Sequence, residues 1–420
     1  MITRRKLVPL AILTLVALVL YLQFDRALVL RDRLVSGSPP SADGQDAVPP
    51  PAPEILSPQN LTKYINSILD PSSTAVPRLK CPATNTTRYA SLVIPPSPAP
   101  LDSQPVQYFI ALDLRNCLPV LPRLLGSILS AIHHLNPASC FLSIVEGNSP
   151  DGTADVLAAL RPHLTRLGIR HAITTHHPLN PLGHSSDRFS SLATLRNLAL
   201  APLPSLPTTP TTTILFVNDV AACPDDLLEL LLQRVRHAAH LACAMDWVGA
   251  DPRVFYDSYI ARAINGDLFF EVPPETTSWA RATELFWNEP VARARLARGV
   301  PFQVFACWNG AVAMAAEPVV KGGVRFRGTG KGECHAGEPQ TFCKDLWWGG
   351  WGRVMVVPSV NLEYEDGRAE GVKREKGFVG DWVAKGDEGE AIEWRGPPDL
   401  VKCMPTFNRQ SWEPWNQTLV

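Results

Sequence analysis

The stretch TILFVNDV, residues Thr213–Val220, decides the fold class of this chain. Its β-branched and aromatic residues form a continuous apolar run, which is typical of a buried strand in a parallel sheet. The run ends at Asn218 and Asp219, and open α/β sheets bind ligands just beyond the carboxyl ends of such strands. A carboxylate there can hold a divalent cation against a diphosphate. The alternative is that Asp219 only caps the helix expected to start near Pro224.

Strands and helices alternate on the N-terminal side of this stretch. The apolar spacing predicts strands at 108–112, 141–145 and 169–174, and helices at 121–132, 153–167 and 188–200. This alternation predicts a parallel sheet with right-handed crossovers and helices packed against it. The strand at 141–145 also ends in polar residues, beginning with Glu146. Two polar strand ends at one sheet edge favour a ligand site over isolated helix caps.

The N-terminal region predicts a membrane anchor and a stem. Three basic residues, Arg4 to Lys6, precede an apolar run at 7–24 whose length is near the minimum for crossing a bilayer. Residues 1–24 are therefore expected to be a basic cytosolic tail with a single transmembrane helix, the alternative being a cleaved signal peptide. Proline clusters predict an extended lumenal stem over 25–105, with a short helix at 61–69. The catalytic domain is expected at 106–420, with 367–396 as a surface-loop insertion.

Several features fit a lumenal location. Acceptor sequons for N-glycosylation begin at Asn60, Asn85 and Asn416. Nine cysteines are compatible with disulfides in an oxidising compartment, and their odd number leaves at least one unpaired within the chain. The candidate pairs are Cys334 with Cys343, Cys117 with Cys140, and Cys223 with Cys243. No Cys-x-x-Cys motif exists, which disfavours zinc.

Charge and glycine patterns exclude several other functions. The chain has 39 basic and 40 acidic residues, without the basic stripe that is typical of nucleic-acid-binding proteins. No Gly-x-Gly-x-x-Gly motif follows the first strand, and no phosphate-binding loop with Gly-Lys-Ser/Thr occurs. A nucleotide-sugar site is compatible with the remaining pattern. Its candidate donor-binding residues are Glu146, Asn148, Asp151 and Arg196, of which Arg196 has an ordinary surface role as its alternative.

These motifs, taken in order, resemble the fungal capsule-associated α-1,3-mannosyltransferases of glycosyltransferase family 69. The matching segments are EGNSPDGT (146–153), LRNLAL (195–200), FVNDV (216–220), AMDW (244–247), FYD (255–257), NGD (265–267), CWNG (307–310) and 333–345. The resemblance implies a GT-A-like fold with a Rossmann-type mixed sheet, a type II Golgi membrane protein, and GDP-mannose as donor. The segment after Val217 lacks the second acid of Asp-x-Asp, so a metal-independent variant stays open.

The expected active site has a metal side and an acceptor side. Asp219 is expected to bind a divalent cation, Mn²⁺ above others, with help from Asn218 or Asp246. Candidate catalytic acids are Asp246, Asp267 and Glu338. Flat aromatic and polar groups in the C-terminal half are candidates for binding the acceptor sugar, although tryptophans are more often core residues. These acceptor candidates are Trp308, Asn309, Trp347 and Trp348.

The sequence thus predicts a lumenal, membrane-anchored glycosyltransferase of the Golgi or endoplasmic reticulum. The resemblance implies mannosyl transfer to a glycan acceptor, with α-1,3 linkage and retention, in wall or capsule synthesis. Two alternatives stay open. One is an inverting transferase that uses Asp267, Glu333 or Glu338 as base. The other is an inactive chain of the same fold that scaffolds other glycosyltransferases, because fold does not determine function.

Overall fold

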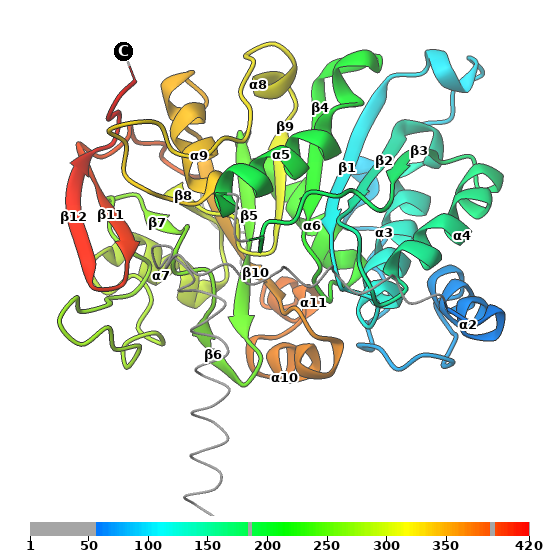
Figure 1. The fold of residues 1–420 in the computed structure, drawn as a ribbon, viewed down its shortest axis with the longest axis horizontal. Coiled ribbons are helices and arrows are strands. Elements are labelled where there is room, and N and C mark those ends of the chain that lie inside the picture. Colours follow the sequence, from blue (N-terminus) through cyan, green and yellow to red (C-terminus); the bar gives the residue numbers. More distant parts are fainter. Residues whose placement is uncertain (1–55, 184–186, 387–390, 420) are drawn as a thin grey trace, which may run out of the picture. The chain divides into compact units, whose positions relative to one another are not determined.

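One large mixed sheet forms the centre of the protein (Figure 1). The computed structural model describes residues 56–419, apart from 184–186 and 387–390. Its strands follow the order β3-β2-β1-β4-β9-β5-β10-β8-β7, and β6 pairs with β5 beside this path. The strands are β1 (Val106–Leu114), β2 (Cys140–Glu146), β3 (Arg170–Thr174), β4 (Thr208–Val217), β5 (Leu241–Val248), β6 (Asp251–Phe255), β7 (Arg262–Ala263), β8 (Phe302–Ala306), β9 (Ala311–Ala315) and β10 (Val354–Leu362).

The strand directions bring six carboxyl ends to one edge of the sheet. Strands β3, β2, β1 and β4 are parallel, and β9 runs antiparallel between β4 and β5. Since β10 is parallel to β5, both point the same way as β4. The parallel half confirms the predicted fold class. Strand β4 begins at Thr208, inside the predicted loop, where the Thr212 hydroxyl donates to the Val106 carbonyl at 2.7 Å.

Helices cover both faces of this sheet. Successive β1 residues alternate between two cores, with Phe109 in one and Ile110 in the other. Helices α5 and α9 pack on the first face, while α3, α4, α6, α10 and α11 pack on the second (Figure 1). The longer helices are α2 (Pro58–Leu69), α3 (Leu121–Leu135), α4 (Thr153–Arg166), α5 (Arg188–Leu200), α6 (Pro224–Arg236), α7 (Pro290–Arg298), α9 (Glu338–Trp348) and α10 (Asp366–Lys376); α8 (Glu317–Val320) and α11 (Val379–Val383) are short.

Residues 56–105, expected to be an extended stem, instead fold onto the second face of the sheet. The predicted short helix is confirmed as α2, which packs against α3. Tyr89 is fully buried, and Arg88 forms an ion pair with Glu229 of α6 at 2.7 Å. The compact unit therefore begins well before residue 106, because apolar residues between the proline clusters supply a second packing surface. The predicted anchor at 7–24 lies outside the described residues, and no described helix has the length and apolarity to cross a bilayer.

The disulfides differ from all three candidate pairs. The structure links Cys81 to Cys223, Cys243 to Cys307, and Cys334 to Cys403. The other three cysteines, Cys117, Cys140 and Cys343, are buried thiols, so the odd count does leave unpaired residues. Sequence proximity failed as a guide because each bond joins elements brought together by the sheet or by the folded N-terminal segment.

The predicted surface-loop insertion at 367–396 contains most of α10 and all of α11. Lys373 of α10 is buried and donates to both carboxylate oxygens of Asp226, each at 2.7 Å. This segment contributes to the second core through buried apolar residues such as Ala369 and Val379. After it, β11 (Leu400–Thr406) and β12 (Arg409–Pro414) form a separate hairpin.

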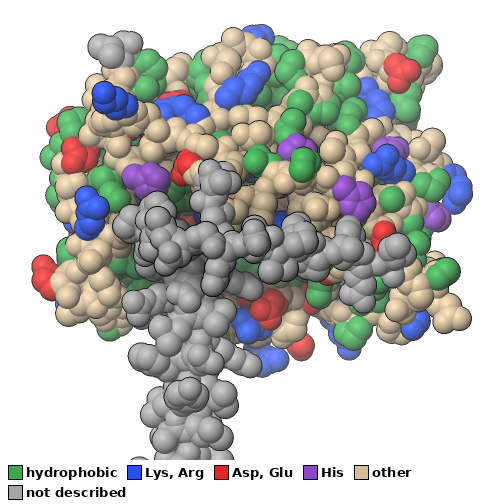
Figure 2. Space-filling view, viewed as in Figure 1, with side chains coloured by type: hydrophobic (Ala, Val, Ile, Leu, Met, Phe, Trp, Pro, Cys, Tyr) green, Lys and Arg blue, Asp and Glu red, His purple; other side chains and the backbone are tan. Residues whose placement is uncertain are grey.

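The surface is mixed in charge. On the face shown in Figure 2, the described Lys and Arg side chains are interspersed with Asp and Glu. This distribution agrees with the near-zero net charge of the sequence. The three sequon residues Asn60, Asn85 and Asn416 are all exposed and thus accessible to modification.

Candidate active site at the carboxyl edge of the sheet

Five acidic residues gather at the edge where the parallel strands end. They are Asp113 in β1, Asp219 after β4, Asp246 in β5, Asp257 after β6, and Glu338 at the start of α9. We call them the acidic cluster. Their charges interact, since Asp219 and Glu338 both raise the pKa of Asp113, and Asp257 raises that of Asp246. The sheet topology therefore creates a region of concentrated negative charge.

Arg196 of α5 lies within this cluster and is held on three sides. Its Nε donates to Glu338 Oε1 at 2.8 Å, and its Nη1 donates to Asn218 Oδ1 at 3.4 Å. Its guanidinium also lies 4.6 Å from the centre of the Trp308 ring, a cation–π geometry. Arg196 was expected to contact a phosphate. In the structure Arg196 is a buried positioning residue, because its ion pair with Glu338 and its contact with the Trp308 ring fix its side chain.

The turn after β4 presents Asp219 at the surface of the cluster. The amide of Asn218 donates to the Gly310 carbonyl at 2.9 Å, and that of Ala221 donates to the Glu363 carbonyl at 2.8 Å. These bonds tie the turn to the start of β9 and the end of β10. Asp219 itself is partly exposed; burial raises its pKa, and nearby Arg196 opposes this rise.

Two expectations about this turn are corrected. The Asn218 side-chain oxygen accepts from Trp308 Nε1 at 3.0 Å as well as from Arg196, so it supports the turn and is not free to bind a cation. The alternative role of Asp219 as a helix cap is also wrong. Helix α6 is capped at Cys223, whose amide donates to Asp226 at 2.8 Å.

Asp246 and Asp257 form a hydrogen-bonded layer beneath this turn. Asp246 accepts from the Tyr364 hydroxyl at 2.9 Å and from the Asp257 amide at 3.3 Å. Burial raises the pKa of Asp246 well above its usual value, and the charge of Asp257 adds to the rise. Burial likewise raises the pKa of Asp257 to about 6, although the Asn309 amide donates to it at 3.1 Å.

Trp308 and Asn309 do not face an acceptor. Both are buried, with exposures of 2% and 0%. Trp308 lies beneath Arg196 and Asn218, while the Asn309 side chain donates to the Ala244 carbonyl at 2.8 Å. Asn309 has a positive φ of 54°, a conformation asparagine tolerates better than most residues. These residues shape the site from below and cannot stack on a sugar.

Trp347 and Trp348 lie at the far end of α9. The helix starts at Glu338 in the acidic cluster, and ten residues at 1.5 Å each put Trp348 about 15 Å further along it. Trp347 is core, since its ring stacks on Phe305 and its Nε1 donates to the Phe305 carbonyl at 2.9 Å. Trp348 is exposed, but beside Trp415. Sequence proximity to Glu338 was misleading because a helix carries its two ends apart.

The predicted donor residues mostly hold local turns. Glu146 is fully buried and accepts from the amide of Ser149 at 2.5 Å and from that of His176 at 2.8 Å. Asp151 accepts from the amide of Thr153 at 3.0 Å, at the start of α4. Both acids hold the loop after β2, and they also tie it to the neighbouring loops, because Glu146 accepts from His176 and Asp151 accepts from the Leu118 amide at 3.0 Å. Asn148 lies in this same loop, is partly exposed, and has a positive φ of 55°.

Asp267 lies outside the acidic cluster. It follows β7 at the edge of the sheet, and its oxygens accept from the Leu268 amide at 2.9 Å and from Asn288 Nδ2 at 2.8 Å. Lys402 of the C-terminal hairpin is 3.9 Å away. These contacts make Asp267 a structural residue of this region, so the expected catalytic role is not supported by its position.

Two acids of the site were missed from the sequence. Asp113 lies at the end of β1, much as Asp219 lies just after β4. The rule that a carboxylate at the end of an apolar strand marks a ligand site could therefore have identified Asp113 as well. Asp257 had no such signal, because it follows a short edge strand and reaches the site only through the bend after β6. The exposed ring of Tyr256 beside it packs on Tyr364 at 5.0 Å.

We expect Asp113→Asn to change stability in a pH-dependent way. Burial, with Glu338 and Asp219 nearby, raises the Asp113 pKa to about 7, from an ordinary value of about 3.9. The folded state therefore holds the Asp113 proton more tightly than the unfolded state does. As pH rises from about 4 to 7, the protein loses the stabilisation that this bound proton contributes to the free energy of unfolding. The variant avoids that loss. We define the difference as the melting temperature of the variant minus that of the unsubstituted protein, measured with chelator. This difference should be larger at pH 8 than at pH 5. Equal differences at the two pH values would contradict the prediction.

The acidic cluster fits a divalent cation that is shared with a substrate. In the described part of the chain, no three His, Cys, Asp or Glu side chains converge as a complete metal site. A cation that completes its coordination with diphosphate oxygens needs only one or two protein carboxylates. Asp219 lies in the turn after β4, is partly exposed, and shows no ion pair among the described residues. The surrounding negative charge would favour a cation there.

A mixed α/β sheet with flanking helices and an acidic cluster at its carboxyl edge are compatible with the GT-A-like fold that the family resemblance implies. The sequence comparisons agree and are more specific. Residues 107–345, more than half of the chain, match the family described as Cryptococcal mannosyltransferase 1. A relative, α-1,3-mannosyltransferase CMT1 of Cryptococcus neoformans var. neoformans serotype D, is 34% identical over 335 residues, covering 74% of this chain and 71% of the relative. The chain belongs to this fungal capsule mannosyltransferase family and is a glycosyltransferase.

The solved structures that match the chain are more distant from it. Mannosyltransferase PcManGT from Pyrobaculum calidifontis, in complex with GDP-Man and Mn²⁺, is 12% identical with a TM-score of 0.36, covering 79% of this chain and 76% of that chain. Residues 1–349 of S. aureus TarS are 13% identical with a TM-score of 0.36, and the match covers 67% of this chain and 66% of that chain, just under two thirds of its length.

Proposed function

We propose that this chain transfers mannose from GDP-mannose to a glycan acceptor, forming an α-1,3 linkage with retention at the sugar carbon. The name of the Cryptococcus relative, an α-1,3-mannosyltransferase, supports the sugar and the linkage. The observation that carries the chemistry is the position of Asp219, partly exposed after β4 within the acidic cluster. The product would be part of a wall or capsule glycan.

The residues of the site have distinct roles in this proposal. Asp219 would hold a divalent cation, Mn²⁺ above others, together with the donor diphosphate. When bound, the cation supplies Lewis-acid stabilisation of the departing diphosphate. Arg196 holds Asn218 and thereby the turn that aims Asp219, and it limits the mutual repulsion of the acids. The exposed ring of Tyr256 offers an apolar surface next to this position.

Retention is supported by the state of the candidate bases. An inverting transferase needs a carboxylate that is free to accept a proton from the acceptor hydroxyl. Asp246 is fully buried and already accepts two hydrogen bonds, while Glu338 is buried in its ion pair with Arg196. Neither acid is available to an incoming hydroxyl. A retaining reaction makes no such demand.

A donor screen with the full-length chain tests this function. We expect product from GDP-mannose, much less from UDP-sugars, and loss of product when EDTA replaces Mn²⁺. Product mass identifies the sugar, and the anomeric proton signals in NMR identify linkage and stereochemistry. An inverted product would establish the inverting alternative, with Asp113 or Asp257 as the next candidate base. Absence of transfer with every donor would favour a scaffolding role.

The location of the chain belongs to the same proposal. We place the catalytic unit in the lumen of the Golgi or endoplasmic reticulum, behind an uncleaved anchor at residues 7–24. The three disulfides and the exposed Asn60, Asn85 and Asn416 support an oxidising, glycosylating compartment. Membrane fractionation and glycosidase treatment of the expressed chain test it; a soluble form without glycans would overturn it.

A further inference from the structure

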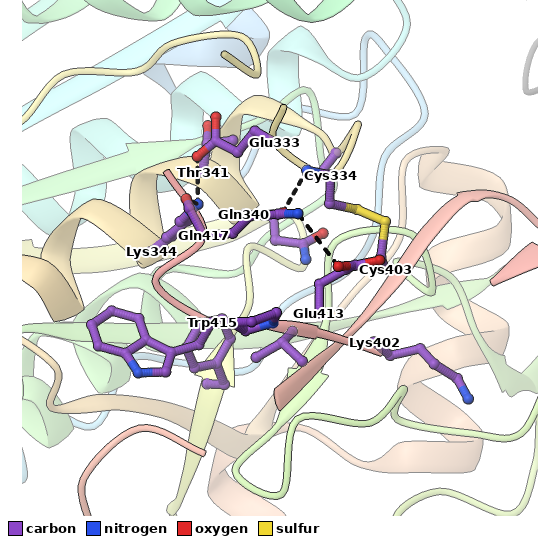
Figure 3. A pocket seen from close by; sticks show the side chains of 14 residues that line it. Glu333, Cys334, Gln340, Thr341, Lys344, Lys402, Cys403, Glu413, Trp415 and Gln417 are labelled. Carbon is purple, nitrogen blue, oxygen red and sulfur yellow. Dashed lines mark hydrogen bonds and ion pairs between the residues drawn. A yellow bond between two sulfur atoms is a disulfide. The ribbon is translucent and has the colours of Figure 1, made fainter. Parts of the chain in front are cut away.

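A small pocket with a volume of about 40 Å³ lies between α9 and the C-terminal hairpin (Figure 3). None of its lining residues belongs to the acidic cluster. The lining includes Gln340, Lys344, Lys402, Glu413, Trp415 and Gln417. The disulfide between Cys334 and Cys403 joins its two walls, and Lys344 donates to the Gln417 carbonyl across it. The pocket is thus a fixed part of the fold.

Gln340 is the residue that marks this pocket as a binding site. Its side chain is only 7% exposed, and its amide oxygen is buried without a hydrogen-bond donor among the described residues. An unpaired buried carbonyl destabilises the folded state, so native proteins rarely retain one without another reason. A ligand hydroxyl can supply the missing donor.

Most charges around the pocket are ion-paired. Glu333 is ion-paired with Lys344 at 2.5 Å and with Arg327 at 2.7 Å. Glu413 accepts from Gln417 Nε2 at 3.4 Å, and Lys402 lies 3.9 Å from Asp267, outside the pocket. The Glu413 carboxylate accepts from neutral donors, the Ser411 hydroxyl and the Gln417 amide, so it can also accept from a ligand hydroxyl. The lining therefore suits a neutral ligand that carries hydroxyl groups.

Two tryptophans border the pocket and continue it onto the surface. Trp415 lines the pocket, and its ring lies 6.2 Å from that of Trp348, which is 48% exposed. A flat indole face beside hydrogen-bonding groups is suited to a pyranose ring, whose C–H face is apolar and whose edge carries hydroxyls. This is where Trp348 contributes to a possible sugar contact, away from the acidic cluster.

We propose that this pocket binds a neutral oligosaccharide, with one sugar on Trp415 and a hydroxyl donated to Gln340. Gln340 lies two residues after Glu338 on α9, so the pocket and the acidic cluster share the first turn of one helix. A glycan bound here would be a segment of the acceptor remote from its reacting hydroxyl. That acceptor role rests on the proposed function, whereas oligosaccharide binding itself does not.

The test measures binding of α-linked mannotetraose to the full-length chain by calorimetry, with EDTA and without donor. All arms carry Asn416→Gln, so that a glycan on that neighbouring residue cannot occupy the pocket. We expect Trp415→Ala to weaken binding by about tenfold or more, as expected for a lost apolar contact. The matched control is Trp412→Ala, an exposed tryptophan of the same hairpin that does not line the pocket.

Gln340→Met separates binding from folding. Methionine keeps the volume and removes the unpaired carbonyl, so the melting temperature should stay the same or rise while affinity falls by about fivefold. Unchanged affinity in both Gln340→Met and Trp415→Ala, or no binding by the parent chain, would overturn the pocket. If Asp219→Asn binds the oligosaccharide while the parent chain transfers no mannose, the proposed function fails and the pocket stands.

Discussion

Asp219→Asn is expected to lower the rate of mannosyl transfer by about 10²–10³-fold, because several kcal/mol of transition-state stabilisation would be lost with the cation. The fold should persist. Burial raises the Asp219 pKa, so the charged form is disfavoured in the folded protein and a neutral amide relieves that cost. The melting temperature at pH 7 should therefore be equal or higher. Steady-state rates with saturating Mn²⁺, alongside thermal melts, measure both effects.

Asp267→Asn is the matched control for this variant. Asp267 is a buried acid that lies outside the acidic cluster and accepts from Leu268 and Asn288. Its substitution should lower the melting temperature and leave the rate per folded molecule nearly unchanged. Full activity of Asp219→Asn, or an equal loss of rate in both variants, would remove Asp219 from the chemistry.

Lys373→Met is expected to cost about 3–5 kcal/mol in the free energy of unfolding. Lys373 and Asp226 are each 1% exposed, and their ion pair joins α10 to the first turn of α6. Removing Lys373 leaves the Asp226 charge buried without an opposite charge. The desolvation of that unpaired charge strongly destabilises the folded state. Chemical denaturation at pH 7 measures the loss. Asp226 also caps α6, so transfer activity should fall with the folded fraction.

Two comparisons make this second result specific. The double variant Lys373→Met with Asp226→Asn should recover part of the loss, because it removes the uncompensated charge while an amide can still accept from Cys223. Lys321→Met breaks an exposed ion pair with Glu317, with exposures of 65% and 46%, and should cost less than about 1 kcal/mol. A loss for Lys373→Met as small as that for Lys321→Met would contradict the buried-pair interpretation.

Local pattern was sufficient for the elements that build the site. The apolar run before Asn218 predicted β4, and the order of strands and helices around it predicted the parallel half of the sheet. A strand buried on both faces needs a continuous apolar segment, and parallel strands need helical crossovers. Both the buried strand and the strand–helix alternation can therefore be predicted from residues close together in the sequence. For the same reason the sequence found Asp219 and Asp246 at strand ends.

Long-range packing decided which of the candidate residues share a site. Glu338 reaches the acidic cluster because Arg196, distant in sequence, pairs with it, whereas Asp267 follows β7, the last strand of the sheet, and lies beside Lys402. Trp347 enters the core because α9 turns that face toward Phe305. Which side chains share a site depends on how helices and strands pack against one another. The spacing of residues along the chain does not specify that packing.

The sequence by itself thus determined the fold class, the family and the strand end that carries Asp219. The tertiary structure alone decided the partners: Arg196 as a positioning residue, Asp257 as a fifth acid, and a pocket beside Gln340 at the start of α9. It also decided that residues 56–105 pack onto the sheet and that Cys81 pairs with Cys223. The physical reason is the separation of the interacting residues along the sequence. Hydrophobic periodicity is a property of a single helix or strand, whereas ion pairs, disulfides and pockets form between elements that are distant in the chain.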